Sequence, residues 1–193
     1  MKKICLLLLL LLAAGFSLSA QDAGYPDIIN NGTIFLNAGI GFGYKLEDGA
    51  DMKIPPLLVS ADFAIPIALQ PFTVGIMAVY AAEKGTFGSA PASFGFSSHI
   101  IGAAFRLGYH LGWGIKPLDT YVHFFVGDIM SLTSLSYKNS SFSSRDTSNE
   151  FDNTSWIGIG IGGRYFFHPN VGAYIEANIA KLYNFGLGVS FRI

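Results

Sequence analysis

The sequence has almost no cysteine, little charge, and no long apolar run after residue 20. Cys5 is the only cysteine in 193 residues. It lies in an N-terminal segment that we predict is removed, so the mature chain would have no disulfide, cysteine zinc site or cysteine nucleophile. Charged residues make up 13% of the chain, about half the share usual in soluble domains. A formal net charge of −1 gives no general attraction to nucleic acid, and no nucleic-acid partner is expected.

The N-terminus has the three parts of a secretory signal peptide. Lys2 and Lys3 form a basic start, residues 6–14 an apolar core, and residues 17–20 a small-residue exit. This arrangement predicts that residues 1–20 are a signal peptide cleaved after Ala20, leaving residues 21–193 as one domain. The apolar core is shorter than the roughly 20 residues of a membrane-spanning helix. After Ala20 no segment reaches the ~18 uninterrupted apolar residues that such a helix requires.

The rest of the chain alternates in hydrophobicity with the period of a β-strand. An apolar face lies opposite a face of Gly, Ala and polar residues in eight segments, each about ten residues long. These segments are residues 33–44, 57–65, 72–80, 99–110, 118–130, 156–167, 171–180 and 183–193. The prolines need no place in the middle of a hydrogen-bonded ladder. The pattern predicts an all-β fold, a closed eight-stranded antiparallel up-and-down barrel.

One segment also matches a nucleotide-binding fingerprint. Gly158, Gly160 and Gly163 read as GxGxxG, which binds a dinucleotide only when a helix follows, because the helix N-terminus supplies the phosphate-binding amides. Here the glycines lead into aromatic residues and a proline turn. The spacing of two between Gly158, Gly160 and Gly162 places them on one face of a strand. We therefore predict a strand and no nucleotide cofactor.

The composition of the two faces indicates which one points outward. A soluble barrel would expose the glycine-bearing face, but soluble surfaces are roughly 25–35% charged and this face carries few charges. It fits the crowded interior of an eight-stranded barrel, where glycines make room for larger neighbours. We therefore predict a transmembrane barrel whose apolar face contacts lipid. A soluble periplasmic lipocalin-like carrier is the alternative.

Aromatic residues gather at both ends of the expected strands, as in barrels that cross a bilayer. The connections near Glu47, Gly88 and Ser143 are long and polar, and those near Gln70, Gly114 and Pro169 are short. The aromatics at the long-loop end are Tyr44, Tyr80 and Tyr183, and those at the short-turn end are Phe72, Tyr109, Tyr165, Phe167 and Phe191.

The face predicted to line the lumen holds most of the charged residues of the strands. They are Asp62, Arg106, Arg164, Glu176 and Arg192. If Phe167 pairs with Val171 across the turn, Arg164 lies opposite Tyr174 and diagonal to Glu176. We therefore expect an Arg164–Glu176 contact within a lumen polar network that includes Asp62 and Arg106. Separate hydration of each group is the alternative.

The last strand carries the most specific motif. Asn184, Gly186, Val189 and Phe191 form a polar-x-Gly-x-x-apolar-x-aromatic pattern, followed by Arg192 and Ile193. In this motif and in its strand pattern the chain resembles the small outer-membrane barrel superfamily that includes OmpA-, OmpX- and OmpW-like proteins. The resemblance implies a multi-pass barrel in a bacterial outer membrane, with its termini in the periplasm. It also implies that these four residues are the assembly signal read by the barrel assembly machinery.

Enzymes of related barrels modify lipid A, one with a His-x-Ser pair, but His99, His110, His123 and His168 are not followed by that spacing. No metal-ligand spacing is present either. We predict a non-enzymatic, monomeric protein without cofactor or metal. Its role would be envelope integrity or surface interaction, with the loop at residues 134–154 contacting a host or extracellular ligand. The alternative is an OmpW-like conduit for small hydrophobic solutes, past lumen-facing Phe35, Phe125, Trp156 and Tyr174.

Overall fold

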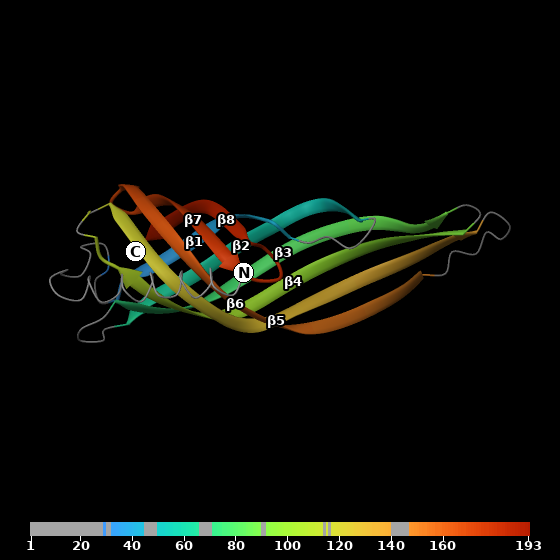
Figure 1. Cartoon of the computed structure of the whole chain (residues 1–193), viewed down its shortest axis with the longest axis horizontal. Coiled ribbons are helices and arrows are strands. Elements are labelled where there is room, and N and C mark those ends of the chain that lie inside the picture. The colour runs from blue at the N-terminus through green and yellow to red at the C-terminus, as the bar shows by residue number, and fades with distance from the viewer. Residues whose placement is uncertain are drawn as a thin grey trace, which may run out of the picture.

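The computed structural model describes residues 29, 32–44, 50–65, 71–89, 92–113, 115, 117–139 and 147–193. Eight strands pair antiparallel in chain order, and β1 closes the sheet against β8 (Figure 1). The strands are β1 (Ile34–Phe42), β2 (Ala50–Ile65), β3 (Phe72–Ser89), β4 (Ala92–Leu111), β5 (Leu118–Asn139), β6 (Thr147–His168), β7 (Val171–Ile179) and β8 (Phe185–Arg192). The predicted closed eight-stranded antiparallel barrel is confirmed. Among the described residues, no helix is long and apolar enough to cross a membrane. The predicted signal peptide lies outside these residues.

The strands are steeply staggered around the barrel. Starting at Asp128 on β5 and following paired residues through β4, β3, β2, β1, β8, β7 and β6 leads back to β5 at Leu118. The circuit therefore closes ten residues away from where it began. A stagger of this size tilts the strands by roughly 40°, within the range of small barrels. Each residue along a strand then adds about 2.5 Å of height along the barrel axis.

The two faces of the strands point as predicted. On β6, Ile157, Ile159 and Ile161 are 59%, 50% and 55% exposed, whereas Trp156 and Arg164 are fully buried. The apolar face is therefore outside and the glycine-bearing face lines the lumen. On β5 the outer apolar belt rises from Leu118 to Asp128, which is about 25 Å of height at this tilt, and Met130 and Leu132 are exposed beyond it.

The glycines of β6 make room for aromatic side chains on the neighbouring strand. A Cβ at Gly160 would lie 2.8 Å from Nε2 of His123 and 2.7 Å from the carbonyl oxygen of Ala177. The pairs formed across β5 and β6 are Phe125 with Gly158, His123 with Gly160, and Tyr121 with Gly162. The GxGxxG match is thus a packing feature of a strand.

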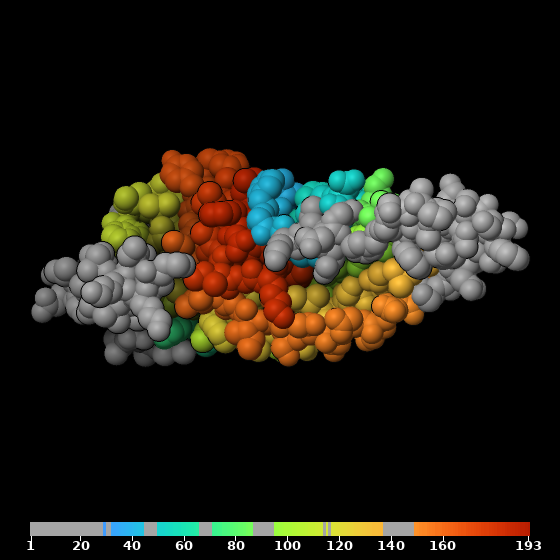
Figure 2. Space-filling view, turned by 45° about the vertical axis from the view of Figure 1, so that its right-hand side comes forward, coloured from blue at the N-terminus to red at the C-terminus, as the bar shows by residue number. Residues whose placement is uncertain are grey.

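Five strands continue well past the barrel. β1, β7 and β8 are 9, 9 and 8 residues long, whereas β2 to β6 have 16 to 22 residues. The extra lengths form a projecting sheet, which we define as residues 50–56, 81–89, 92–100, 131–139 and 147–152. It extends to the right in Figure 1, and in Figure 2 the orange surface of β6 continues past the red surface of β7 and β8. The loop predicted at residues 134–154 was wrong in extent, because β5 continues to Asn139 and β6 begins at Thr147.

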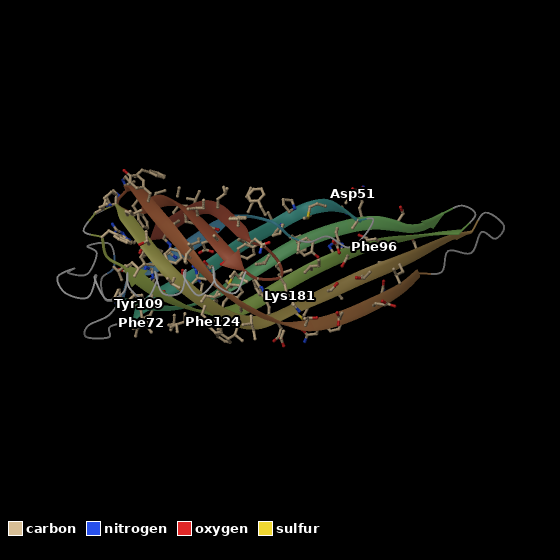
Figure 3. The ribbon with its side chains drawn as sticks, in the orientation of Figure 1. Asp51, Phe72, Phe96, Tyr109, Phe124 and Lys181 are labelled. Carbon is tan, nitrogen blue, oxygen red and sulfur yellow. The ribbon has the colours of Figure 1, made fainter. Side chains whose placement is uncertain are left out.

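The aromatic residues at the turn end lie as predicted, but two at the other end do not. Phe72 and Tyr109 pair with ring centroids 5.2 Å apart (Figure 3), and Phe191 is exposed on the outer face. At the end with the projecting sheet, Tyr183 is only 1% exposed. It lies in the connection after β7, which turns into the barrel, and Tyr44 packs against the same buried cluster. The prediction that these two tyrosines belong to an outer belt was wrong.

Candidate functional site in the barrel interior and on the projecting sheet

The half of the lumen nearest the short turns is built around Arg164 of β6. Its Nη2 donates to Oδ2 of Asp62 at 2.6 Å, and its Nη1 donates to Oδ2 of Asp119 at 3.0 Å. Its guanidinium also lies between two aromatic rings, 4.4 Å from the centroid of Phe35 and 4.2 Å from that of Tyr121. A fully buried guanidinium is therefore neutralised by two carboxylates and held by two cation–π contacts.

Arg106 of β4 forms the second centre. Its Nη2 donates to Oε1 of Glu176 at 2.5 Å, and its Nε lies 3.3 Å from Oδ1 of Asp62, an ion-pair contact without hydrogen-bond geometry. Tyr121 donates its hydroxyl proton to the same Oε1 of Glu176 at 2.8 Å. Asp62 thus bridges the two arginines, with one carboxylate oxygen toward each.

Two buried histidines extend the network toward its edges. Nδ1 of His110 lies 2.7 Å from Oδ1 of Asp119, and Nε2 of His110 lies 3.1 Å from the hydroxyl oxygen of Thr73. Nε2 of His123 lies 2.6 Å from Oδ1 of Asn178, and this amide oxygen can only accept a hydrogen bond. We therefore assign the His123 proton to Nε2, which leaves Nδ1 to face the guanidinium of Arg106 at 3.5 Å.

The network joins seven of the eight strands through side chains alone. Its members are Asn37 (β1), Asp62 (β2), Thr73 (β3), Arg106 and His110 (β4), Asp119, Tyr121 and His123 (β5), Arg164 (β6), and Glu176 and Asn178 (β7). Because the strands of a barrel already pair side by side, these contacts add bonds across its diameter. They have the geometry of a rigid plug.

The sequence-predicted residues come together in different pairs from those expected. Arg164 does lie opposite Tyr174, but its carboxylate partners are Asp62 and Asp119, and the guanidinium on Glu176 is that of Arg106. The expected Arg164–Glu176 pairing is corrected accordingly. Arg164 reaches Asp119 directly opposite it on β5 and Asp62 across the narrow lumen on β2, and Glu176 is reached by Arg106 from β4. Arg192 stacks on the ring of Phe166, 5.1 Å from its centroid, near the turn end.

The other half of the lumen is apolar. Trp156 and Phe125 meet edge to face with centroids 4.9 Å apart. Around them pack Leu58, Met77, Val79, Ala81, Ile100, Ala104, Ile129, Leu182 and Tyr183, all buried. The predicted lumen residues Phe35, Phe125, Trp156 and Tyr174 are all buried, and here they fill the interior.

No group of three His, Cys, Asp or Glu side chains that could hold a metal occurs in the part of the chain that the structure describes. His99 lies on the outer face, where its Nδ1 is 2.9 Å from the hydroxyl of Tyr80. The chemistry of the interior is therefore that of paired charges and hydrogen bonds.

The projecting sheet has two edges of different character. Along β6, residues 147–158 pair with β5 in an unbroken register, and among the described residues they have no partner on the other side. Pairing with β7 begins only at Ile159. This edge contains no proline, so its backbone groups are available to another strand.

The edge formed by β2 is blocked. Pairing with β1 reaches only Leu57, and the free stretch before it contains Pro55 and Pro56, which have no N–H to offer. Register shifts between Met52 and Ile54 and between Ile54 and Leu57 also distort it. Prolines and bulges are the usual means of protecting an edge strand. One edge is thus protected and the other is open.

The residues of the predicted assembly signal lie at the closing strand. Val189 and Phe191 face outward on β8 and Gly186 faces inward. Asn184 lies just before β8, where its backbone N–H donates to the carbonyl oxygen of Phe42 at 2.8 Å and its side chain donates to that of Asn178 at 3.3 Å.

No protein-family model matches the sequence, and no curated protein matches it. Among solved structures, the chain is similar to the N-terminal beta-barrel domain of Pseudomonas aeruginosa OprF, with 16% identity over 84% of this chain and 98% of that one and a TM-score of 0.40. It is also similar to Ail, the attachment invasion locus protein of Yersinia pestis, in complex with the heparin analogue sucrose octasulfate. That match has 15% identity over 83% of this chain and 96% of Ail, with a TM-score of 0.38. The chain is similar to Neisserial surface protein A as well, with 17% identity over 85% of this chain and 98% of that one and a TM-score of 0.38.

The chain's own geometry defines it as a closed eight-stranded barrel with an apolar outer belt, a side-chain-filled lumen and a projecting sheet that is open along one edge.

Proposed function

We propose that this chain is an integral β-barrel protein of a bacterial outer membrane, exported by its signal peptide and cleaved after Ala20. The observation that carries the proposal is the apolar belt, about 25 Å tall, on the outside of a closed barrel. In water, such a belt would expose far more contiguous apolar surface than soluble monomers tolerate. In lipid it is satisfied, and closure of the barrel pairs the backbone groups of neighbouring strands around its whole circumference. The barrel assembly machinery would read Asn184, Gly186, Val189 and Phe191.

The interior of this membrane protein would be closed and without enzymatic activity. The cross-lumen ion pairs of Asp62, Arg106 and Arg164 and the packing of Trp156 against Phe125 favour a filled plug over a conduit for hydrophobic solutes. Because both halves of the lumen are occupied by buried side chains, the work of the protein would be done by its surface, as a monomer with the projecting sheet outside the cell.

The open edge of β6 suggests how that surface works. An extended segment of another protein can add itself as a further strand, gaining main-chain hydrogen bonds from the edge and side-chain contacts on both faces. Residues 147–158 offer such an edge, and the proline-blocked edge of β2 does not. We therefore propose surface interaction by strand addition at β6.

The side chains of β6 indicate the chemistry of the added strand. Glu150 and Asp152 are exposed on the face that continues the lumen side, and Phe151 is 64% exposed on the other face. A partner with basic residues on one face and apolar residues on the other would complement both. A second copy of β6 would bring acidic residues opposite acidic residues, which is destabilising. The partner would thus be an extended segment of alternating basic and apolar residues.

Hydrogen exchange of the refolded barrel tests this proposal. The probe is a ten-residue peptide of alternating lysine and valine, added to protein in nanodiscs of zwitterionic lipid. We expect slower exchange for amides in residues 149–157, because half of the edge amides gain acceptors, and no change in residues 50–54 on the blocked edge. The control peptide has proline in place of every second valine. The same protection with the proline peptide, or none with either, would refute strand addition.

A further inference from the structure

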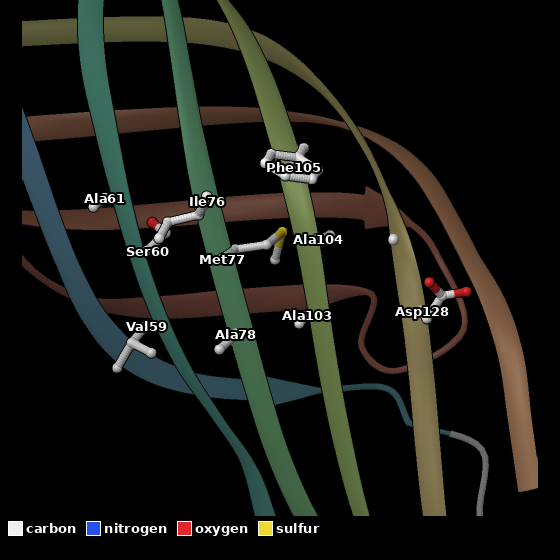
Figure 4. Close-up of a pocket in the computed structure, with 11 residues that line it drawn as sticks. Val59, Ser60, Ala61, Ile76, Met77, Ala78, Ala103, Ala104, Phe105 and Asp128 are labelled. Atoms are coloured by element: carbon white, nitrogen blue, oxygen red, sulfur yellow. The ribbon is translucent and has the colours of Figure 1, made fainter.

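The outer wall of the barrel carries a trough that crosses β3 and β4 within the apolar belt. Ala78 and Ala103 are Cα partners on these strands, and both side chains are small. The rows on either side carry larger outward side chains, Ile76 paired with Phe105 below and Tyr80 paired with Ile101 above. The result is a hollow of about 520 Å³ that is lined mainly by carbon (Figure 4).

The trough is apolar at one end and polar at the other. Along the same row of paired residues, Ala78 is followed by Val59 on β2, and Ala103 is followed by Asp128 on β5. Asp128 is exposed and lines the hollow, and its Cα partner on β6 is Ser155, also exposed. Among the described residues, no hydrogen bond or ion pair engages the Asp128 carboxylate. It lies about 25 Å above Leu118 along the barrel axis, at the upper limit of the belt.

We propose that this trough binds a single-tailed amphiphile with a primary ammonium head, its tail along Ala78 and Ala103 and its head on Asp128. The inference rests on the proposed position of the belt in a membrane. A hydrocarbon tail in the trough would make van der Waals contacts with the apolar side chains that line the gap between the larger neighbours. The row of paired residues climbs along the barrel axis from Val59 to Asp128. A tail that begins deep in the belt therefore places its head group at the polar boundary.

The head is assigned by charge. A lone carboxylate that faces lipid is unfavourable, less so near the interface than at the midplane. An ammonium group has three donors and no acceptor, so it can bind the Asp128 carboxylate and the Ser155 hydroxyl together. A carboxylate or phosphate head in the same place would meet Asp128 with like charge. The site is therefore expected to select an amine over an anion with the same tail.

Native mass spectrometry of the folded barrel tests the proposal in detergent, so a failure here would leave the proposed membrane insertion untouched. The probes are hexadecylamine and palmitate. We expect the wild-type protein to retain one hexadecylamine and to bind palmitate at least tenfold more weakly. Asp128→Asn should weaken hexadecylamine binding about tenfold by removing the charge. Ala103→Leu should weaken it at least as much by filling the trough.

Ala173→Leu is the matched control, since Ala173 is also outward-facing but lies on β7, away from the trough. It should retain hexadecylamine as the wild type does. Folding of every variant is checked by its shifted gel mobility without heating. Equal retention of palmitate, or unchanged retention by folded Asp128→Asn and Ala103→Leu, would overturn the proposal. Equal loss in Ala173→Leu would do so too, because binding would then follow the general belt surface.

Discussion

Asp62→Asn is expected to destabilise the folded barrel by about 3–5 kcal/mol, because it removes one member of a buried ion network and leaves the others uncompensated. Asp62 is 1% exposed and is the carboxylate shared by Arg106 and Arg164. An asparagine keeps the size of the side chain but supplies no charge to either guanidinium. The measurement is the free energy of unfolding from reversible urea titration of protein in lipid vesicles, followed by tryptophan fluorescence.

Two further variants make this test specific. Glu176→Gln removes the other carboxylate on Arg106 and should also destabilise the barrel by several kcal/mol, about the range for one broken buried pair. Lys181→Gln removes an exposed charge in the connection after β7 and should change the free energy by less than about 0.5 kcal/mol. Wild-type stability in Asp62→Asn and Glu176→Gln would mean that these groups are separately hydrated and that no network operates.

Gly160→Ala is expected to cost about 1–3 kcal/mol or more, the range for overpacking a filled interior. The new Cβ would lie 2.7 Å from the carbonyl oxygen of Ala177 and 2.8 Å from Nε2 of His123. The first of these atoms belongs to the backbone of β7, so the clash cannot be relieved by a side-chain rotation alone. The same urea titration measures the effect.

Gly163→Ala is the matched control in the same strand. The nearest atom to its new Cβ would be the carbonyl oxygen of Asp119 at 3.8 Å, an ordinary contact. Since alanine restricts the unfolded chain more than glycine does, this variant should be neutral or more stable by about 0.4–1 kcal/mol. If both variants lost the same stability, crowding on the lumen side would not be the reason that Gly160 is glycine.

The strand pattern and its faces could be predicted from the sequence because the barrel wall separates two different environments. Where lipid-facing and lumen-facing residues differ, as Ile159 and Gly160 do, the period of two is visible. Along the projecting sheet both faces lie beyond the belt, and residues 131–139 alternate less clearly between apolar and polar. The sequence therefore suggested a loop where the strands in fact continue.

Strand pairing alone predicts only some of the network contacts. Asp119 lies directly opposite Arg164 on the adjacent strand, so an estimate of the β5–β6 register would have placed it in the network. His110 and His123 share the inward face with Arg106 and Tyr121, and that parity was a usable signal. The contacts of Arg164 with Asp62 and of Arg106 with Glu176 cross the lumen between strands that are not neighbours. They depend on barrel closure and stagger, which no local pattern reveals.

A depth scan along β6 tests most directly whether the outward face meets lipid. Nitroxide labels are placed one at a time at Ile161, Ile159, Ile157, Ser155 and Asn153, all outward-facing, in protein refolded into vesicles. We expect collisions with oxygen to be greatest near Ile161 and Ile159, at the middle of the belt, and collisions with a water-soluble nickel chelate to dominate at Asn153. High accessibility of Ile161 and Ile159 to the chelate, with no gradient along the strand, would contradict a membrane-spanning belt.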